Sequence, residues 1–166
     1  MTEQQHAHEG HRMDGQDLAR GAALTRLAVS ATLHCLTGCA IGEVLGLVLA
    51  TWWGWSNGPA VALAVLLAFV FGYGLTVAPV LRSGLPLRSA LAVAFAADTV
   101  SIITMEVVDN AVVLAVPGAM EAGLTSLLFW GSLALSLVVA FVVTVPVNRA
   151  LIGRGKGHAV VHAYHH

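Results

Sequence analysis

Positive charge is missing from most of this sequence. Only 8 of its 166 residues are Lys or Arg, and charged residues of both signs make up 10% of the chain. Hydrophobic residues make up 57%, and the mean hydropathy is +0.80. A soluble domain needs a larger share of polar surface than this. The composition therefore indicates a membrane protein, and a net charge of -1 gives no reason to expect a nucleic-acid partner.

The sequence also lacks the motifs of common enzymes. Nothing in it resembles a nucleotide-binding loop, a dinucleotide-binding glycine pattern or a Ser or Cys hydrolase signature. Its only cysteines, Cys35 and Cys39, do not have the spacing of a structural zinc site. No apolar core of signal-peptide length precedes the first long hydrophobic run. We therefore expect neither an enzyme nor an organic cofactor, and no cleaved export signal.

Four hydrophobic segments are long enough to cross a membrane, because a helix needs roughly 20 apolar residues for a hydrocarbon core of about 30 Å. They cover residues 27–51, 59–81, 89–116 and 124–147. The predicted fold class is all-α: a polytopic membrane protein whose four transmembrane helices form one domain, residues 27–148. A polar, His-containing tail, 1–26, precedes it, with a short interfacial helix expected from Met13 to Arg26. A basic, His-rich tail, 149–166, follows it.

The positive residues predict the orientation of these helices. Lys and Arg occur only in the two tails and in the middle loop, residues 82–88, while the other two loops have none. Basic residues favour the cytoplasmic side, so both termini are predicted to be cytoplasmic. Trp52, Trp53 and Trp55, at the other end of the first span, are typical of an aromatic belt at the membrane interface.

Acidic residues interrupt the spans without basic partners. Glu43, Asp98, Glu106 and Asp109 lie in predicted spans that contain no Lys or Arg. Each ionised carboxylate near the bilayer centre costs at least ~2.5 to 3.5 kcal/mol. These acids must therefore be protonated, face water or bind a cation.

Helical spacing brings the acids together with sulfur and nitrogen ligands on two faces. On the third span, one stripe with its margin holds Asp98, Ser101, Met105, Glu106, Asp109 and Asn110. On the first span, the residues spaced by four are Cys35, Cys39 and Glu43, with His34 beside them. From the rise per residue we expect Cys39 at the depth of Asp98, and Glu43 near Met105 and Glu106.

The ligand chemistry of these two faces is mixed. Thiol and thioether groups select soft ions such as Cu(I), imidazole suits copper and zinc, and carboxylates suit protons and harder ions. We therefore expect a site between the first and third helices that binds and translocates a cation, with a transition metal as first choice and copper ahead of zinc or iron. The predicted metal ligands are His34, Cys35, Cys39, Glu43, Asp98, Met105, Glu106 and Asp109. Ser101 and Asn110 are predicted to support them.

Other functions fit the same residues. The acids and His34 would suffice for proton conduction, and a metal site could bind without transporting. A small scaffold subunit of a larger membrane complex would need neither proton conduction nor metal binding. A redox disulfide between Cys35 and Cys39 is less favourable, because side chains one helical turn apart run parallel to each other.

The two tails add candidate binding groups on the predicted cytoplasmic side. His158 and His162 are four apart and could collect copper or zinc, although terminal histidines can also be incidental. Arg149, Arg154 and Lys156 follow the fourth span and could hold anionic lipid head groups, each worth about 1 kcal/mol.

A glycine ridge on the first span indicates close helix packing. Gly38, Gly42 and Gly46 form a doubled G-x-x-x-G pattern that lets another helix approach closely. Because four helices leave little room to enclose a path, we expect a homo-oligomer that uses this ridge. Packing within one chain is the alternative.

The strings "LHCLTGCAIGEVLG", "ADTVSIITMEVVDN" and "VPVNRALIGRGKGHAVVH" resemble a bacterial family of small four-span inner-membrane proteins classed as a domain of unknown function. The resemblance covers roughly residues 28–162. It implies the four-span fold and a location in the bacterial cytoplasmic (inner) membrane, but no activity. Its motif positions in this sequence are His34, Cys35, Cys39, Glu43, Asp98, Glu106, Asp109 and Asn110.

Overall fold

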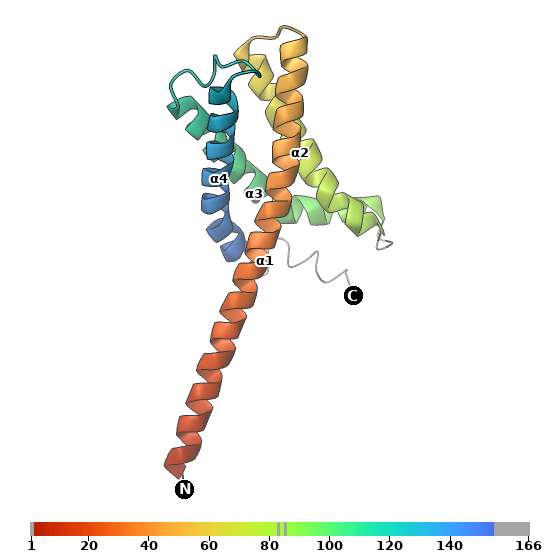
Figure 1. The fold of residues 1–166 in the computed structure, drawn as a ribbon. Helices are drawn as coiled ribbons and strands as arrows, with labels where there is room; N and C mark the ends of the chain where they lie inside the picture. Colours follow the sequence, from red (N-terminus) through yellow and green to blue (C-terminus); the bar gives the residue numbers. More distant parts are fainter. Residues whose placement is uncertain (1, 83, 85, 155–166) are drawn as a thin grey trace.

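The computed structural model describes residues 2–82, 84 and 86–154, and their side chains from residue 19 onward except at 93 and 97. Over these residues the regular structure is entirely helical. Four helices follow one another: α1 (Thr2–Trp52), α2 (Asn57–Arg82), α3 (Leu87–Ala115) and α4 (Leu127–Gly153) (Figure 1). The predicted all-α fold is confirmed.

Three or four of the described helices can cross a membrane. Residues Ala19–Trp52 of α1, all of α2 and all of α4 are each long and apolar enough. Helix α3 qualifies only if its two segments, Leu87–Ala96 and Asp98–Ala115, which meet at a bend of 48°, count as one span. The predicted bounds of the second and third spans lie within two residues of α2 and α3, whereas α4 ends six residues beyond the predicted end of the fourth span.

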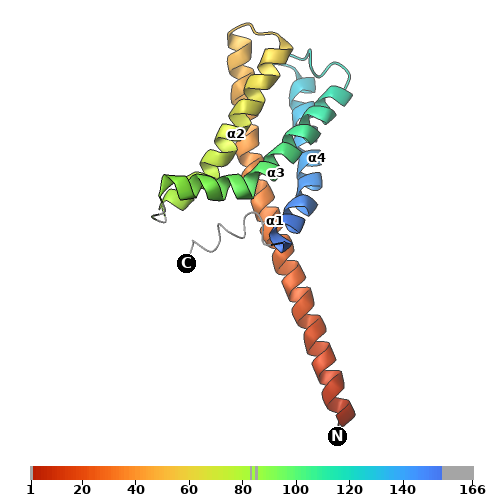
Figure 2. The same ribbon diagram turned by 180° about the vertical axis from the view of Figure 1, so that it is seen from behind.

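Helix α1 is longer than the sequence suggested. The predicted short helix from Met13 to Arg26 is not a separate element, since α1 is continuous from Thr2 to Trp52. The first proline of the chain is Pro59, so no proline interrupts the helix. Its N-terminal part extends beyond the other three helices (Figures 1 and 2).

Helices α1 and α2 pack at very short range through the glycine ridge. Gly42 lies against Ala68, where an added Cβ would be 2.3 Å from the Ala68 backbone nitrogen. Gly38 faces Gly72 and Gly46 faces Ala64 in the same way. The ridge is therefore covered by α2 of the same chain, so a homo-oligomer would have to use another face.

The bend in α3 lies next to the first of its acids. In Figure 2, the segment before the bend runs sideways beside the end of α2, and the segment after it turns back along α1 and α4. Tyr73 of α2 contacts α3 on both sides of the bend. Its ring stacks on Phe95, before the bend, at 4.7 Å, and its hydroxyl lies 2.9 Å from the Thr99 hydroxyl, after the bend. Asp98 therefore lies where α3 changes direction.

Candidate functional site

Three carboxyl groups converge between α1 and α3. Glu43 of α1 and Glu106 and Asp109 of α3 are only 5 to 6% exposed. The side chains of Glu43 and Asp109 are close enough to interact with each other, and Glu106 is close enough to interact electrostatically with both. On the α4 side, the Ser136 hydroxyl donates a hydrogen bond to Asp109 Oδ1. We call Glu43, Glu106 and Asp109 the carboxyl cluster.

The carboxyl cluster has unused hydrogen-bonding capacity. The Oε2 atoms of Glu43 and Glu106 are buried and have no hydrogen-bond partner among the described residues. A buried polar atom without a partner costs about 1 to 3 kcal/mol. The chain itself therefore leaves two carboxyl oxygens that a proton, a water molecule or a cation would satisfy.

A cavity of about 150 Å³ leads to the carboxyl cluster. Glu43 and Asp109 line its inner part. Trp55, Asn57 and residues 119, 120 and 122–124 line it at the end of the bundle where the α1–α2 and α3–α4 connections lie. A single water molecule needs only about 10 to 15 Å³ of such space. The cavity is therefore large enough to bring several water molecules to two of the three acids.

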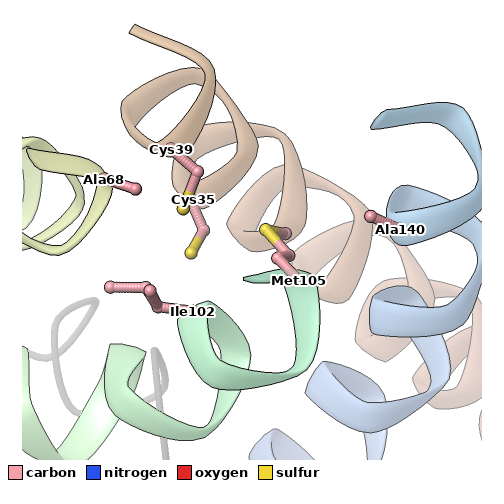
Figure 3. Close-up of a cluster of buried hydrophobic side chains, with 6 residues drawn as sticks. All are labelled: Cys35, Cys39, Ala68, Ile102, Met105 and Ala140. Carbon is pink, nitrogen blue, oxygen red and sulfur yellow. The ribbon is translucent and has the colours of Figure 1, made fainter. Parts of the chain in front are cut away.

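A second buried cluster, on the other side of Glu106, contains the sulfur atoms. Cys35 and Cys39 of α1 are each 2% exposed, and Met105 of α3 is 1% exposed. Figure 3 shows their side chains on the facing sides of the two helices, with Ile102 and Ala68 around them. We call Cys35, Cys39 and Met105 the sulfur cluster.

The sulfur cluster lies next to the carboxyl cluster. The side chain of Cys39 is close enough to those of Cys35 and Glu106 to interact with both. Glu106 in turn interacts electrostatically with Asp109, which lies beside Glu43 at the cavity. The two clusters therefore follow one another between α1 and α3.

The remaining predicted ligands lie apart from these two clusters. Asp98 is 1% exposed and lies beside Thr76 of α2. It precedes Glu106 by eight residues, or about 12 Å of helix rise. Cys39 lies in one buried cluster with Ile102 and Met105, four and seven residues after Asp98, and not with Asp98 as expected. Glu43 is close enough to Glu106 to interact with it electrostatically, as the sequence predicted.

Two other predicted site residues, His34 and Asn110, lie outside both clusters. His34 is half-buried and is not among the residues of the sulfur cluster. Asn110 lines the cavity and donates from Nδ2 to the Glu106 carbonyl oxygen at 2.9 Å. Within the described residues, no group of three or more His, Cys, Asp and Glu side chains is arranged to hold a metal ion. The structure thus shows two neighbouring clusters, one of carboxyl groups and one of sulfur atoms, where the sequence suggested a single mixed site.

The sequence analysis missed the contribution of α4. This helix buries a polar stripe toward the other helices, made of Ser132, Ser136, Thr144 and Asn148. Small polar residues at intervals of four or eight in an otherwise apolar span are the signal that could have revealed it.

The polar stripe of α4 also links helices at the end of the bundle that lies away from the cavity. Asn148 Nδ2 donates to Thr32 Oγ1 of α1 at 2.8 Å, and its Oδ1 accepts from the Ser101 hydroxyl of α3. The predicted supporting residue Ser101 therefore serves Asn148. Three helices are linked there, whereas the other end holds the cavity.

Only some of the residues predicted to bind lipid or metal in the C-terminal tail lie among the described residues. Arg149 and Arg154 are exposed, as residues at a lipid head group would be, but no lipid contact is tested. Lys156, His158 and His162 lie outside the described residues.

The family model for a domain of unknown function, DUF4396, matches residues 25–157. The chain belongs to this family. The match includes all four described helices except the N-terminal part of α1, and therefore both clusters. Among curated proteins and among solved structures, none matches the chain. The DUF4396 assignment brings no activity with it, so function has to be argued from the site.

Proposed function

We propose that this DUF4396 protein is an integral protein of the bacterial cytoplasmic membrane that binds a cation at the carboxyl cluster and translocates it across the bilayer. The observation that carries the proposal is the convergence of Glu43, Glu106 and Asp109, two of which, Glu43 and Asp109, line a cavity. Such acids are expensive in a membrane, and there they are usually part of an ion or proton path.

The charge balance of the chain supports the need for an external cation. Residues 27–81 and 89–148 contain no Lys or Arg, so no basic side chain from those segments neutralises the three acids. Three ionised carboxylates would cost roughly 8 to 10 kcal/mol even on insertion scales. We infer that a proton or another cation neutralises them, since no Lys or Arg of those segments can.

A proton is the cation that the geometry of the carboxyl cluster favours. Glu43 and Asp109 lie close together in a buried place, and two neighbouring ionised carboxylates repel each other, so a proton on one of them is favoured. Such a pair can release a proton to water in the cavity and take up another. The orientation inferred from the basic residues puts this cavity on the side away from the cytoplasm.

Proton flux into liposomes tests the proposal. Purified protein is reconstituted around a pH-sensitive dye, and a pH gradient is imposed with a potassium ionophore present to carry the compensating charge. We expect wild-type flux to exceed that of empty liposomes, and Glu43→Gln and Asp109→Asn to lower it at least tenfold. Glu121→Gln is the matched control, because Glu121 is an exposed residue of the α3–α4 connection. Wild-type flux no greater than that of empty liposomes, or full flux in both variants, would refute the proposal.

A transition metal is the second candidate cation, and copper is the first choice among the transition metals. The specific observation is the sulfur cluster, which lies next to Glu106 of the carboxyl cluster. The same liposomes, loaded with a metal-sensitive dye, separate the possibilities. Metal binding without flux would indicate storage, and absence of both would favour a scaffold subunit.

A further inference from the structure

We propose that the cavity beside the carboxyl cluster is a binding site for a small organic ammonium ion, in which a short alkyl link joins one aromatic ring to a primary ammonium group. The ammonium group binds at Glu43 and Asp109, and the ring occupies the apolar part of the cavity. The proposal rests on the proposed function in taking these acids as a cation site, and it names a substrate class for that site. It concerns binding, which is measured in detergent without a pH gradient. It can therefore fail while proton flux persists, and hold where flux is absent.

The wall of the cavity changes in character from its inner part outward. Helices α1 and α3 line it with residues spaced by four, which share one face of each helix. On α1 these are Glu43, Leu47 and Thr51, and on α3 they are Asp109 and Val113. Each step of four residues rises about 6 Å toward the end of the bundle where the two connections lie (Figure 1). An apolar layer therefore lies one helical turn outward from the two acids.

All four helices contribute to this apolar layer. Ala64 of α2 packs against the glycine that precedes Leu47 on α1. Leu133 of α4 lies three residues before Ser136, whose hydroxyl donates to Asp109. Among the described residues that line the cavity there is no Lys, Arg or His. An inorganic cation gains nothing from an apolar wall, whereas the hydrocarbon part of an organic cation is removed from water by it.

Glu43 selects a cation that donates hydrogen bonds. Its side chain is 5% exposed and lines the cavity, and its Oε2 atom has no hydrogen-bond partner among the described residues. A primary ammonium group has three N–H donors, so it satisfies this oxygen and supplies the positive charge as well. A quaternary ammonium group supplies the charge without a donor. The site therefore favours the primary ammonium group.

The volume of the cavity limits the ligand to about one ring. The cavity holds about 150 Å³. An engineered apolar cavity of about 150 Å³ in another protein binds benzene. A single ring fills the apolar layer, and a short alkyl link lets the ammonium group reach the acids one turn further in.

Equilibrium binding of radiolabelled benzylammonium to the full-length protein in a non-ionic detergent tests the proposal. We expect saturable binding of one ligand per chain. Three unlabelled competitors should each displace it at least tenfold more weakly than unlabelled benzylammonium does. Benzyl alcohol has the ring without the charge, methylammonium has the charge without the ring, and benzyltrimethylammonium has both without an N–H donor. Absence of saturable binding, or displacement by methylammonium as strong as by benzylammonium, would overturn the proposal.

Two pairs of variants locate the ligand in the cavity. Glu43→Gln should bind benzylammonium at least tenfold more weakly, whereas Glu121→Gln, in the exposed α3–α4 connection, should match wild type. Val113→Phe fills the apolar layer and leaves both acids in place, so it should also weaken binding at least tenfold. Leu114→Phe is its matched control, because Leu114 is exposed and does not line the cavity.

A change of ligand preference separates a binding role of Val113 from a merely structural one. Val113→Ala enlarges the apolar layer, so it should shift the preference from benzylammonium toward phenethylammonium, which is longer by one methylene group. Circular dichroism and melting of each variant show that it is folded. Wild-type binding of benzylammonium by folded Glu43→Gln, or by folded Val113→Phe, would show that the ligand does not lie in this cavity.

Discussion

Replacement of Gly42 by alanine should force α1 and α2 apart. A Cβ at this position would lie 2.3 Å from the backbone nitrogen of Ala68 and 2.4 Å from the backbone carbon of Leu67. Ordinary contact begins at 3.4 Å, so the two helices must separate by about 1.1 Å, the difference between 3.4 and 2.3. Because the obstructing atoms belong to the backbone of α2, no side-chain rotation can relieve the clash.

The expected size of the effect follows from two opposing terms. Overpacking of a closely fitted contact typically costs about 1 to 3 kcal/mol. Alanine is intrinsically better than glycine in a helix by about 0.8 to 1 kcal/mol, which offsets part of that cost. Gly74→Ala is the control, because Gly74 lies in α2 with nothing within 4 Å of an added Cβ, and it should gain the propensity term alone.

Thermal unfolding in detergent, followed by circular dichroism, measures the difference between the two variants. We expect Gly42→Ala to be less stable than Gly74→Ala by about 1 to 3 kcal/mol, the overpacking term, and so to melt several degrees lower. Its proton flux should fall as well, since Glu43 is the next residue on α1. Equal melting temperatures for the two variants would show that α1 and α2 are not packed as described.

The remaining predictions concern the packing of α3 and α4, and each is checked by the same melting measurement. Asn148→Ala should destabilise the protein by about 1 to 3 kcal/mol, because it removes the hydrogen bonds to Thr32 and Ser101. Thr144→Val should be neutral or stabilising, since the buried Thr144 hydroxyl has no hydrogen-bond partner among the described residues. Ile102→Ala should cost about 2 to 5 kcal/mol, because the fully buried Ile102 packs against Gly72.

The sequence was sufficient to predict the helices and the acids between α1 and α3. Long apolar runs have few alternatives to a helix in a membrane, so hydropathy located the spans well. The spacing of Cys35, Cys39 and Glu43 placed them on one face, and the structure buries all three. Helical periodicity determines which residues of one helix share a face. It was therefore enough to predict that Cys35, Cys39 and Glu43 lie together on α1.

The relation between helices could not be predicted in the same way. Counting rise from the ends of straight helices placed Cys39 level with Asp98, but α3 bends by 48° at residues 96–98. The segment before the bend runs sideways and adds little depth (Figure 2), so Met105, seven residues after Asp98, shares a buried cluster with Cys39 instead. Next to the bend, Tyr73 of α2 stacks on Phe95 of α3, and such contacts between two helices leave no periodic signal in either sequence.

The glycine ridge and the site depend on each other through α1. Gly38 and Gly42 immediately precede Cys39 and Glu43 in the sequence, so the two faces are about 100° apart on the same helix. The close approach of α2 uses only backbone and small side chains, and it leaves the adjacent face of α1 free to meet α3. A shift of α1 against α2 would therefore displace a thiol and a carboxyl together. The polar groups of the site cost stability in a membrane. They are held in position by the α1–α2 interface, which itself contains almost no polar side chains.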